Sequence, residues 1–273
     1  MTASHDTAAS PASIDLPVFL IARRAILSPF FYLPEFIKFG GFTILLGIGA
    51  RVLSSLVAKA GLPPLISALL LMIAQFAIAT PFIVTWTNLM VGGRTAVRDR
   101  SVFRYGPVEW RYVLGSGAVI GVSILTGYFA GILITHARQT YDRQLVIEAV
   151  MFDVVLLGAL FIAAVRISFL FPAIATDTYA SLQKSWSQTK GHFERLLAMV
   201  ALTYAPFIVI ADIFIRLTRD RDFFGIVVVR WIVESVNATL AWGAFAAGIA
   251  LAYKIVALKL PIDSPSATES AAQ

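Results

Sequence analysis

The chain has 273 residues, of which 58% are hydrophobic and 14% are charged, with a formal net charge of +6 and a mean hydropathy of +0.80. A soluble domain carries about 25% charged residues, so this chain has too few to cover the core of a soluble protein. The composition therefore excludes a water-soluble globular enzyme and indicates an integral membrane protein. The chain has no cysteine, which excludes disulfides, cysteine-based metal sites and thiol nucleophiles.

The N-terminal part of the chain comes before any clear membrane span. Residues 1–15 are small and polar, without the pattern of a cleavable signal peptide, and we expect a disordered tail there. Residues 16–38 mix apolar side chains with Arg23, Arg24 and several prolines, which makes them a poor span. They predict a short amphipathic helix in the membrane interface, with the aromatic residues 30–32 at the depth of the lipid headgroups. A buried half-span is the alternative.

Six apolar segments are long enough to cross the hydrocarbon core of a bilayer, which takes about 20 residues of helix. They predict an all-α, polytopic membrane helix bundle of six transmembrane helices, preceded by the interfacial helix, in a single domain over residues 16–260. Residues 261–273 are rich in Ser, Ala and Thr, and we expect a second disordered tail there. The six predicted spans are residues 39–56, 64–91, 112–135, 146–171, 196–215 and 224–258.

The distribution of Lys and Arg predicts the orientation of these spans. With six spans, 13 Lys and Arg fall on the side of the two termini and 6 on the opposite side. Because cytoplasmic segments carry the excess of positive charge, we expect both termini to be cytoplasmic.

Two prolines lie inside predicted spans. Pro81 in the second span and Pro206 in the fifth each remove a backbone hydrogen bond and are expected to kink their helices. Broken helices occur at transporter binding sites, but single prolines are also common in structural membrane helices.

Ionisable residues inside the spans form a candidate charge cluster. Each one costs about 2.5–3.5 kcal/mol at the centre of a helix on insertion scales. Arg230 and Glu234 are four residues apart and share a helix face, and we expect them to meet Asp153 or Asp212 in the outer half of the membrane. A structural ion-pair network, a solute or proton pathway, and peripheral snorkelling are the alternatives. The cluster consists of Arg51, Asp153, Asp212, Arg230 and Glu234.

The sequence contains no catalytic signature. It has no nucleophile elbow, zinc-protease, phosphate-loop or dinucleotide-binding pattern, and its three histidines lie in separate polar segments. We therefore expect no enzyme activity, no cofactor and no metal site. The basic residues lie beside apolar segments, as topology signals do, so we expect no nucleic-acid partner.

The segment between the fourth and fifth spans, residues 166–197, reads RISFLFPAIATDTYASLQKSWSQTKGHFERLL. It resembles a group of uncharacterised bacterial six-span membrane proteins, loosely related to the YciC-like proteins and to the membrane domain of some glycerophosphodiester phosphodiesterases. The resemblance implies the six-span fold and a location in the bacterial inner membrane, and it brings no reaction and no catalytic residues. The matching residues are Arg166, Ser168, Pro172, Ser181, Leu182, Ser185, Trp186, Thr189, Lys190 and Gly191.

The same segment also has a physical interpretation of its own. Pro172 is expected to end the fourth span at the cytoplasmic surface, and Ser181 to cap a short helix that stops near Gly191. We expect Leu182, Trp186, Thr189 and Phe193 on one face of this helix, and Lys184 and Lys190 on another. The helix is either a structural connector or a docking surface for lipid headgroups or a cytoplasmic partner.

These features favour an integral membrane protein without catalysis, acting as a membrane scaffold, an accessory subunit or a lipid-associated envelope factor. The expected partners are membrane lipids, with a protein partner or a second copy of the chain as further candidates. The alternative function is a transporter or permease subunit that uses the intramembrane charge cluster. An intramembrane lipid enzyme is a third hypothesis, which no histidine or paired catalytic motif supports.

Overall fold

A computed structural model describes residues 16–61, 64–117, 135, 143–178, 180–218 and 224–262, and every regular element among them is helical. The predicted tail of residues 1–15 and nearly all of the second predicted tail lie outside the described residues, and so does most of the third predicted span.

The described chain consists of long apolar helices joined by short ones. Residues 107–117 are also helical. The elements are α1 (Val18–Phe31), α2 (Leu33–Glu35), the π-helix η1 (Phe36–Gly40), α3 (Gly41–Lys59), α4 (Pro64–Gly92), the 3-10 helix η2 (Arg94–Val97), α6 (Arg143–Arg166), α7 (Leu170–Ala175), α8 (Leu182–Thr189), α9 (Phe193–Thr218) and α10 (Phe224–Val256).

Four stretches of the described helices are long and apolar enough to cross a membrane. They overlap the first, second, fifth and sixth predicted spans, and the first stretch begins at Leu33, inside the segment predicted to be interfacial. Their length and composition support the prediction of a membrane protein. The stretches are Leu33–Val57, Leu70–Gly92, Phe193–Thr218 and Gly225–Val256.

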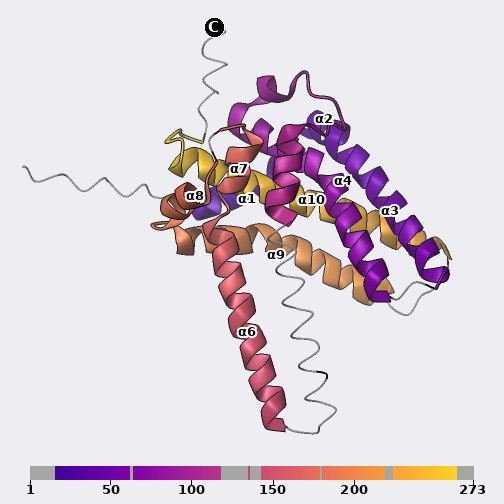
Figure 1. The fold of residues 1–273 in the computed structure, drawn as a ribbon. Coiled ribbons are helices and arrows are strands. Elements are labelled where there is room, and N and C mark those ends of the chain that lie inside the picture. Colours follow the sequence, from indigo (N-terminus) through magenta and orange to yellow (C-terminus); the bar gives the residue numbers. More distant parts are fainter. Residues whose placement is uncertain are drawn as a thin grey trace, which may run out of the picture.

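Helix α10 is the centre of the bundle and contacts α1, α3, α4, α7 and α9 (Figure 1). Its second half is rich in Ala and Gly, which lets neighbouring helices approach closely. A Cβ added at Gly243 would lie 3.1 Å from the ring of Phe82, and one at Gly248 would lie 2.8 Å from the sulfur of Met199. The packing of α4 and α9 against α10 therefore depends on small residues at these positions.

Helix α1 packs against α9 and α10 through one face. Ile21 and Ala25 are fully buried on that face, whereas Phe19 and Phe30 are mostly exposed. Pro29 has no N–H, so the carbonyl of Ala25 loses its helical partner. The hydroxyl of Ser28 donates to that carbonyl at 2.7 Å.

In helix α4, as in α1, a proline leaves a backbone carbonyl without its helical partner, and a side chain donates to that carbonyl instead. Pro81 cannot donate to the carbonyl of Ala77, four residues earlier. The hydroxyl of Tyr105, which follows α4 in the next loop, donates a hydrogen bond to this carbonyl. The contact therefore ties the loop to the helix at the point where the backbone ladder is interrupted.

The fourth predicted span ends earlier than the sequence suggested. We predicted that it would run to residue 171 and end at Pro172, but α6 ends at Arg166, and Pro172 lies inside the separate helix α7. The amide of Leu170 donates to Ile167 at 2.9 Å. The carbonyl of Arg166 instead accepts the hydroxyls of Ser185 and Thr189, at 3.2 and 2.9 Å. The end of α6 is thus set by contacts from α8.

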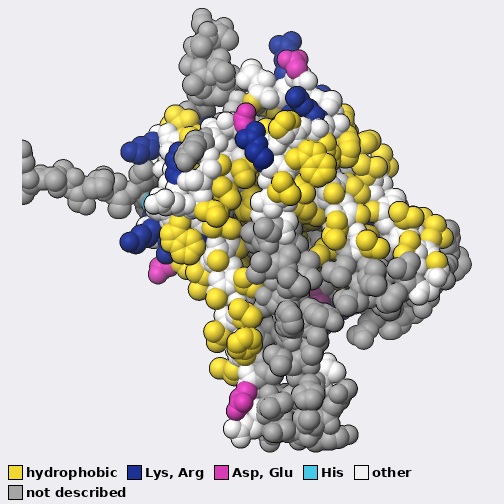
Figure 2. Space-filling view, in the orientation of Figure 1, with side chains coloured by type: hydrophobic (Ala, Val, Ile, Leu, Met, Phe, Trp, Pro, Cys, Tyr) yellow, Lys and Arg dark blue, Asp and Glu magenta, His cyan; other side chains and the backbone are white. Residues whose placement is uncertain are grey.

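The surface separates apolar from cationic side chains. Figure 2 shows Lys and Arg side chains around α2, α7 and α8 at one end of the visible face, with many apolar side chains among the other described residues. Helix α6 exposes a row of large apolar residues, including Val155, which is 66% exposed, and Phe152, which is 56% exposed. Apolar surface of this kind is stable against lipid and unfavourable in water.

We predict that Tyr105→Phe lowers the free energy of unfolding by about 1 kcal/mol, because the carbonyl of Ala77 loses its partner. In a Pro81→Ala background the same change should cost much less, because residue 81 then donates to that carbonyl itself. Thermal unfolding of the unmodified protein, the two single variants and the double variant in detergent measures this. An equal loss in both backgrounds would contradict the explanation.

Candidate functional site

The clearest polar contact inside the bundle joins α3 to α10. Arg51 Nη1 donates to Glu234 Oε2, and the two side chains are 19% and 25% exposed. Leaving either charge alone in an apolar bundle is expensive, and pairing removes most of that cost. The ion pair therefore fixes the position of α3 on the central helix.

Two other predicted members of the charge cluster, Arg230 and Asp212, do not join this pair. Arg230 donates from Nε to the hydroxyl of Thr218 at 3.2 Å and from Nη2 to the Thr218 carbonyl, at the end of α9. Asp212 accepts a hydrogen bond from Arg216 Nε at 2.8 Å, and both side chains are more than half exposed. Asp153 lies in α6, and its side chain is outside the described residues.

We expected Arg230 and Glu234 to meet Asp153 or Asp212. Neither contacts Asp212, and the side chain of Asp153 lies outside the described residues. The spacing of Arg230 and Glu234 does place both on α10, one turn apart, but each is next to a different helix. Arg230 meets the last turn of α9, where carbonyls have no helical partner and a cation is favourable. Glu234 meets α3 instead.

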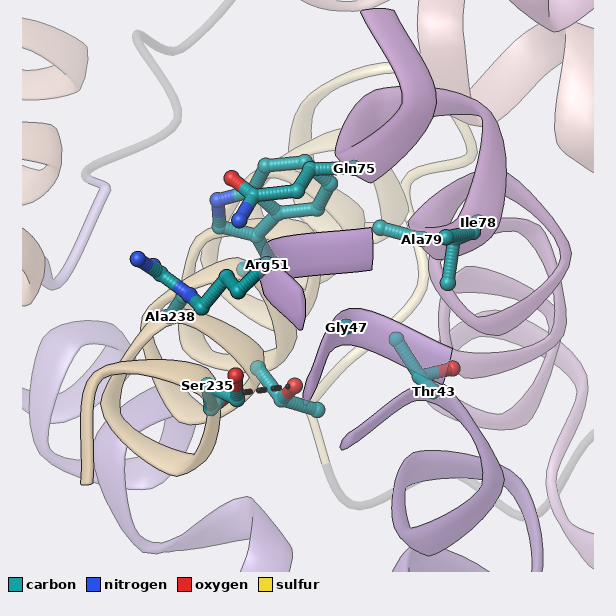
Figure 3. Close-up of a pocket in the computed structure, with 10 residues that line it drawn as sticks. Thr43, Gly47, Arg51, Gln75, Ile78, Ala79, Ser235 and Ala238 are labelled. Carbon is teal, nitrogen blue, oxygen red and sulfur yellow. Dashed lines mark hydrogen bonds between the residues drawn. The ribbon is translucent and has the colours of Figure 1, made fainter. Parts of the chain in front are cut away.

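A small cavity lies beside the Arg51–Glu234 pair, between α3, α4 and α10 (Figure 3). Its volume is about 30 Å³, which is room for about two water molecules. Figure 3 shows Arg51 reaching from α3 towards α10 near Ala238, with Gln75 of α4 beside it. The polar residues that line the cavity are Thr43, Arg51, Gln75, Ser235, Thr239 and Trp242.

Two buried polar atoms at this cavity have no hydrogen-bond partner within the described part of the chain. They are Nε of Arg51 and the hydroxyl of Ser235, whose residue is 5% exposed. Buried groups of this kind are usually satisfied by ordered water. No group of three or more His, Asp or Glu residues close enough to hold a metal ion occurs among the described residues.

A second candidate site is the junction of α6, α8 and α9. The guanidinium of Arg166 lies 5.0 Å from the ring centroid of Phe193 and 5.7 Å from that of Trp186. The hydroxyls of Ser185 and Thr189 donate hydrogen bonds to the carbonyl of Arg166. Arg166 therefore contacts α8 through both its own backbone carbonyl and its own side chain. The structure thus brings Arg166 into contact with three other residues of the 166–197 motif, Ser185, Trp186 and Thr189.

Helix α8 begins as predicted, but its faces are different. The hydroxyl of Ser181 accepts the amide of Lys184 at 3.1 Å and caps the helix, which ends at Thr189, shortly before Gly191. We predicted Leu182, Trp186 and Thr189 on one face. Thr189 is instead fully buried, whereas Leu182 is 60% and Trp186 47% exposed.

No family model matches the chain. No curated protein and no solved structure matches it either. The functional interpretation therefore rests on the geometry of these sites.

Sequence reasoning missed one buried ion pair in the loop after α4. Glu109 is 2% exposed, and its carboxylate accepts Arg100 Nη2 at 2.6 Å and the amide of Gly106 at 2.9 Å. Burial lowers the pKa of Arg100, while the neighbouring charge of Glu109 opposes that shift. A carboxylate three residues after a glycine at a helix start is a capping pattern, and it was the available signal.

We predict that Arg51→Met and Glu234→Gln each destabilise the protein and that the double variant recovers part of the loss. A double-mutant cycle from thermal unfolding in detergent should give a coupling of about 0.5–3 kcal/mol, as for contacting groups. Arg230→Met combined with Glu234→Gln is the matched control and should be closer to additive. Strictly additive effects at Arg51 and Glu234 would show that the pair does not hold α3 on α10.

Proposed function

We propose that the protein is a non-catalytic integral membrane protein, a lipid-associated scaffold or accessory subunit, whose helix α8 lies on the cytoplasmic leaflet. The observation that carries this proposal is the orientation of α8. Its inward face is formed by Ser185 and Thr189, and its apolar residues Leu182 and Trp186 point outward.

Outward apolar residues on a short connector suit a lipid interface. In water, exposed Leu182 and Trp186 would be unfavourable, whereas at a membrane surface their side chains enter the boundary of headgroups and acyl chains. Lys184 on this helix and Lys190, which directly follows it, are exposed where they can attract anionic lipids. Trp is also enriched at this depth of membrane proteins.

The fixed position of α8 supports a docking role. The carbonyl of Arg166 at the end of α6 holds α8 through Thr189, and the guanidinium of Arg166 lies over Phe193 at the start of α9. A helix that is fixed before binding loses little conformational entropy when lipid docks on it.

The proposal includes the topology expected from the sequence: six spans, both termini in the cytoplasm, the bacterial inner membrane, and α1 at the interface. The grouping of exposed cationic side chains around α2, α7 and α8 supports this orientation (Figure 2). The exposed Phe19 and Phe30 of α1 support contact of that helix with lipid.

We prefer this function to transport because of the size of the cavity beside Arg51. A volume of about 30 Å³ holds about two water molecules and no larger solute. Asp212 and Arg230, which a charged pathway would use, have separate partners away from this cavity.

We predict that Lys184→Gln with Lys190→Gln lowers the affinity for phosphatidylglycerol at least tenfold, since each cation near an anionic lipid surface contributes about 1 kcal/mol. Native mass spectrometry of the full chain, titrated with phosphatidylglycerol, measures this affinity. Arg216→Gln, which also removes one exposed cation, is the control and should leave the affinity unchanged. Equal affinities for all variants would refute a lipid-docking role for α8.

A further inference from the structure

The largest cavity described here lies beside α7, away from the Arg51 pair and from the outward face of α8. Its volume is about 480 Å³, within the range of small-molecule sites. One wall is apolar and the rim is charged. The lining residues are Arg111, Leu170, Ile174, Asp177, Thr178 and Ala180.

An exposed ion pair forms the charged rim. Arg111 Nη2 donates to Asp177 Oδ1 at 2.8 Å, and the two side chains are 55% and 66% exposed. A pair exposed to this degree contributes only about 0–1 kcal/mol, so a ligand can separate it at little cost. Within the described residues, Nη1 of Arg111 and Oδ2 of Asp177 make no hydrogen bond, which leaves each group able to bind a ligand.

In the proposed topology, this pair lies at the depth of lipid headgroups. Arg111 is the last charged residue before the uncharged stretch of residues 112–135. Asp177 follows α7 directly, a few residues before the interfacial helix α8. Leu170 and Ile174 of α7 give the cavity its apolar wall. A ligand there would contact a cation, an anion and apolar side chains together.

We propose that this cavity binds the headgroup of phosphatidylethanolamine, a phosphodiester that carries a primary ammonium group. Arg111 binds the phosphate through its planar guanidinium, and Asp177 accepts hydrogen bonds from the ammonium. The lipid replaces one cation–anion contact by two, so no charge is left without a partner. The proposal rests on the proposed function, because it names a lipid for the same cytoplasmic surface.

The charge pattern selects this headgroup among common phospholipids. Phosphatidylglycerol has no ammonium group and would place its phosphate beside Asp177 without compensation. Phosphatidylcholine has a cation, but its quaternary nitrogen has no N–H to donate to the carboxylate. The ammonium hydrogen bond should therefore decide the preference, at about tenfold for a hydrogen bond to a charged group.

The test is a titration of the full chain with phosphatidylethanolamine and with phosphatidylcholine, followed by native mass spectrometry. The unmodified protein should prefer phosphatidylethanolamine about tenfold, and Asp177→Asn should remove that preference. Arg111→Gln should weaken binding of both lipids. Asp212→Asn and Arg216→Gln change the other exposed ion pair, in α9, and should leave both affinities unchanged.

Equal affinities for the two lipids, or an unchanged preference in Asp177→Asn, would overturn the assignment. If equimolar soluble phosphoethanolamine displaced the lipid, the proposal that the ligand is a membrane lipid would be overturned. The α8 variant Lys184→Gln with Lys190→Gln should retain the preference for phosphatidylethanolamine. Its effect on phosphatidylglycerol tests the proposed function separately, so the two proposals can fail independently.

Discussion

The structure depends on one constraint: an apolar environment offers no hydrogen-bond partners, so polar groups must be satisfied within the protein. Three long-range contacts meet this requirement. Tyr105 satisfies the carbonyl freed by Pro81, the hydroxyls of α8 satisfy the carbonyl of Arg166, and Glu234 neutralises Arg51. Each contact also joins two segments that are distant in sequence. The contacts that satisfy polar groups are therefore also contacts that hold the bundle together.

The constraint also explains the division between centre and surface. The central helix α10 uses Ala and Gly to approach its neighbours, and two of its charged residues, Glu234 and Arg230, contact α3 and α9. The exposed cationic side chains at one end have no such limit, because water satisfies them and, in the proposed function, lipid phosphates do as well. Both proposed lipid contacts, on α8 and beside α7, are therefore at the boundary where apolar helices meet polar side chains.

The sequence predicted what depends on local pattern and missed what depends on distant partners. Continuous apolar runs located four spans that the described helices reproduce, and Ser181 predicted the start of α8. The partner of Glu234 is 183 residues away, and the hydroxyls that end α6 are 19 and 23 residues beyond Arg166. No local spacing encodes such contacts. The burial of Ser185 and Thr189 in α8 was missed because polar side chains on a short connecting helix are ordinarily exposed.

The central claim is that the exposed apolar side chains face lipid. The chain has no cysteine, so single cysteines can carry spin labels without a background. Labels at Val155 and Ile208, both exposed and apolar, are compared in lipid nanodiscs with a label at Thr95 in the polar loop. The account predicts faster relaxation by oxygen than by a water-soluble nickel chelate at Val155 and Ile208, and the reverse at Thr95. Relaxation by nickel at Val155 and Ile208 as strong as at Thr95 would contradict it.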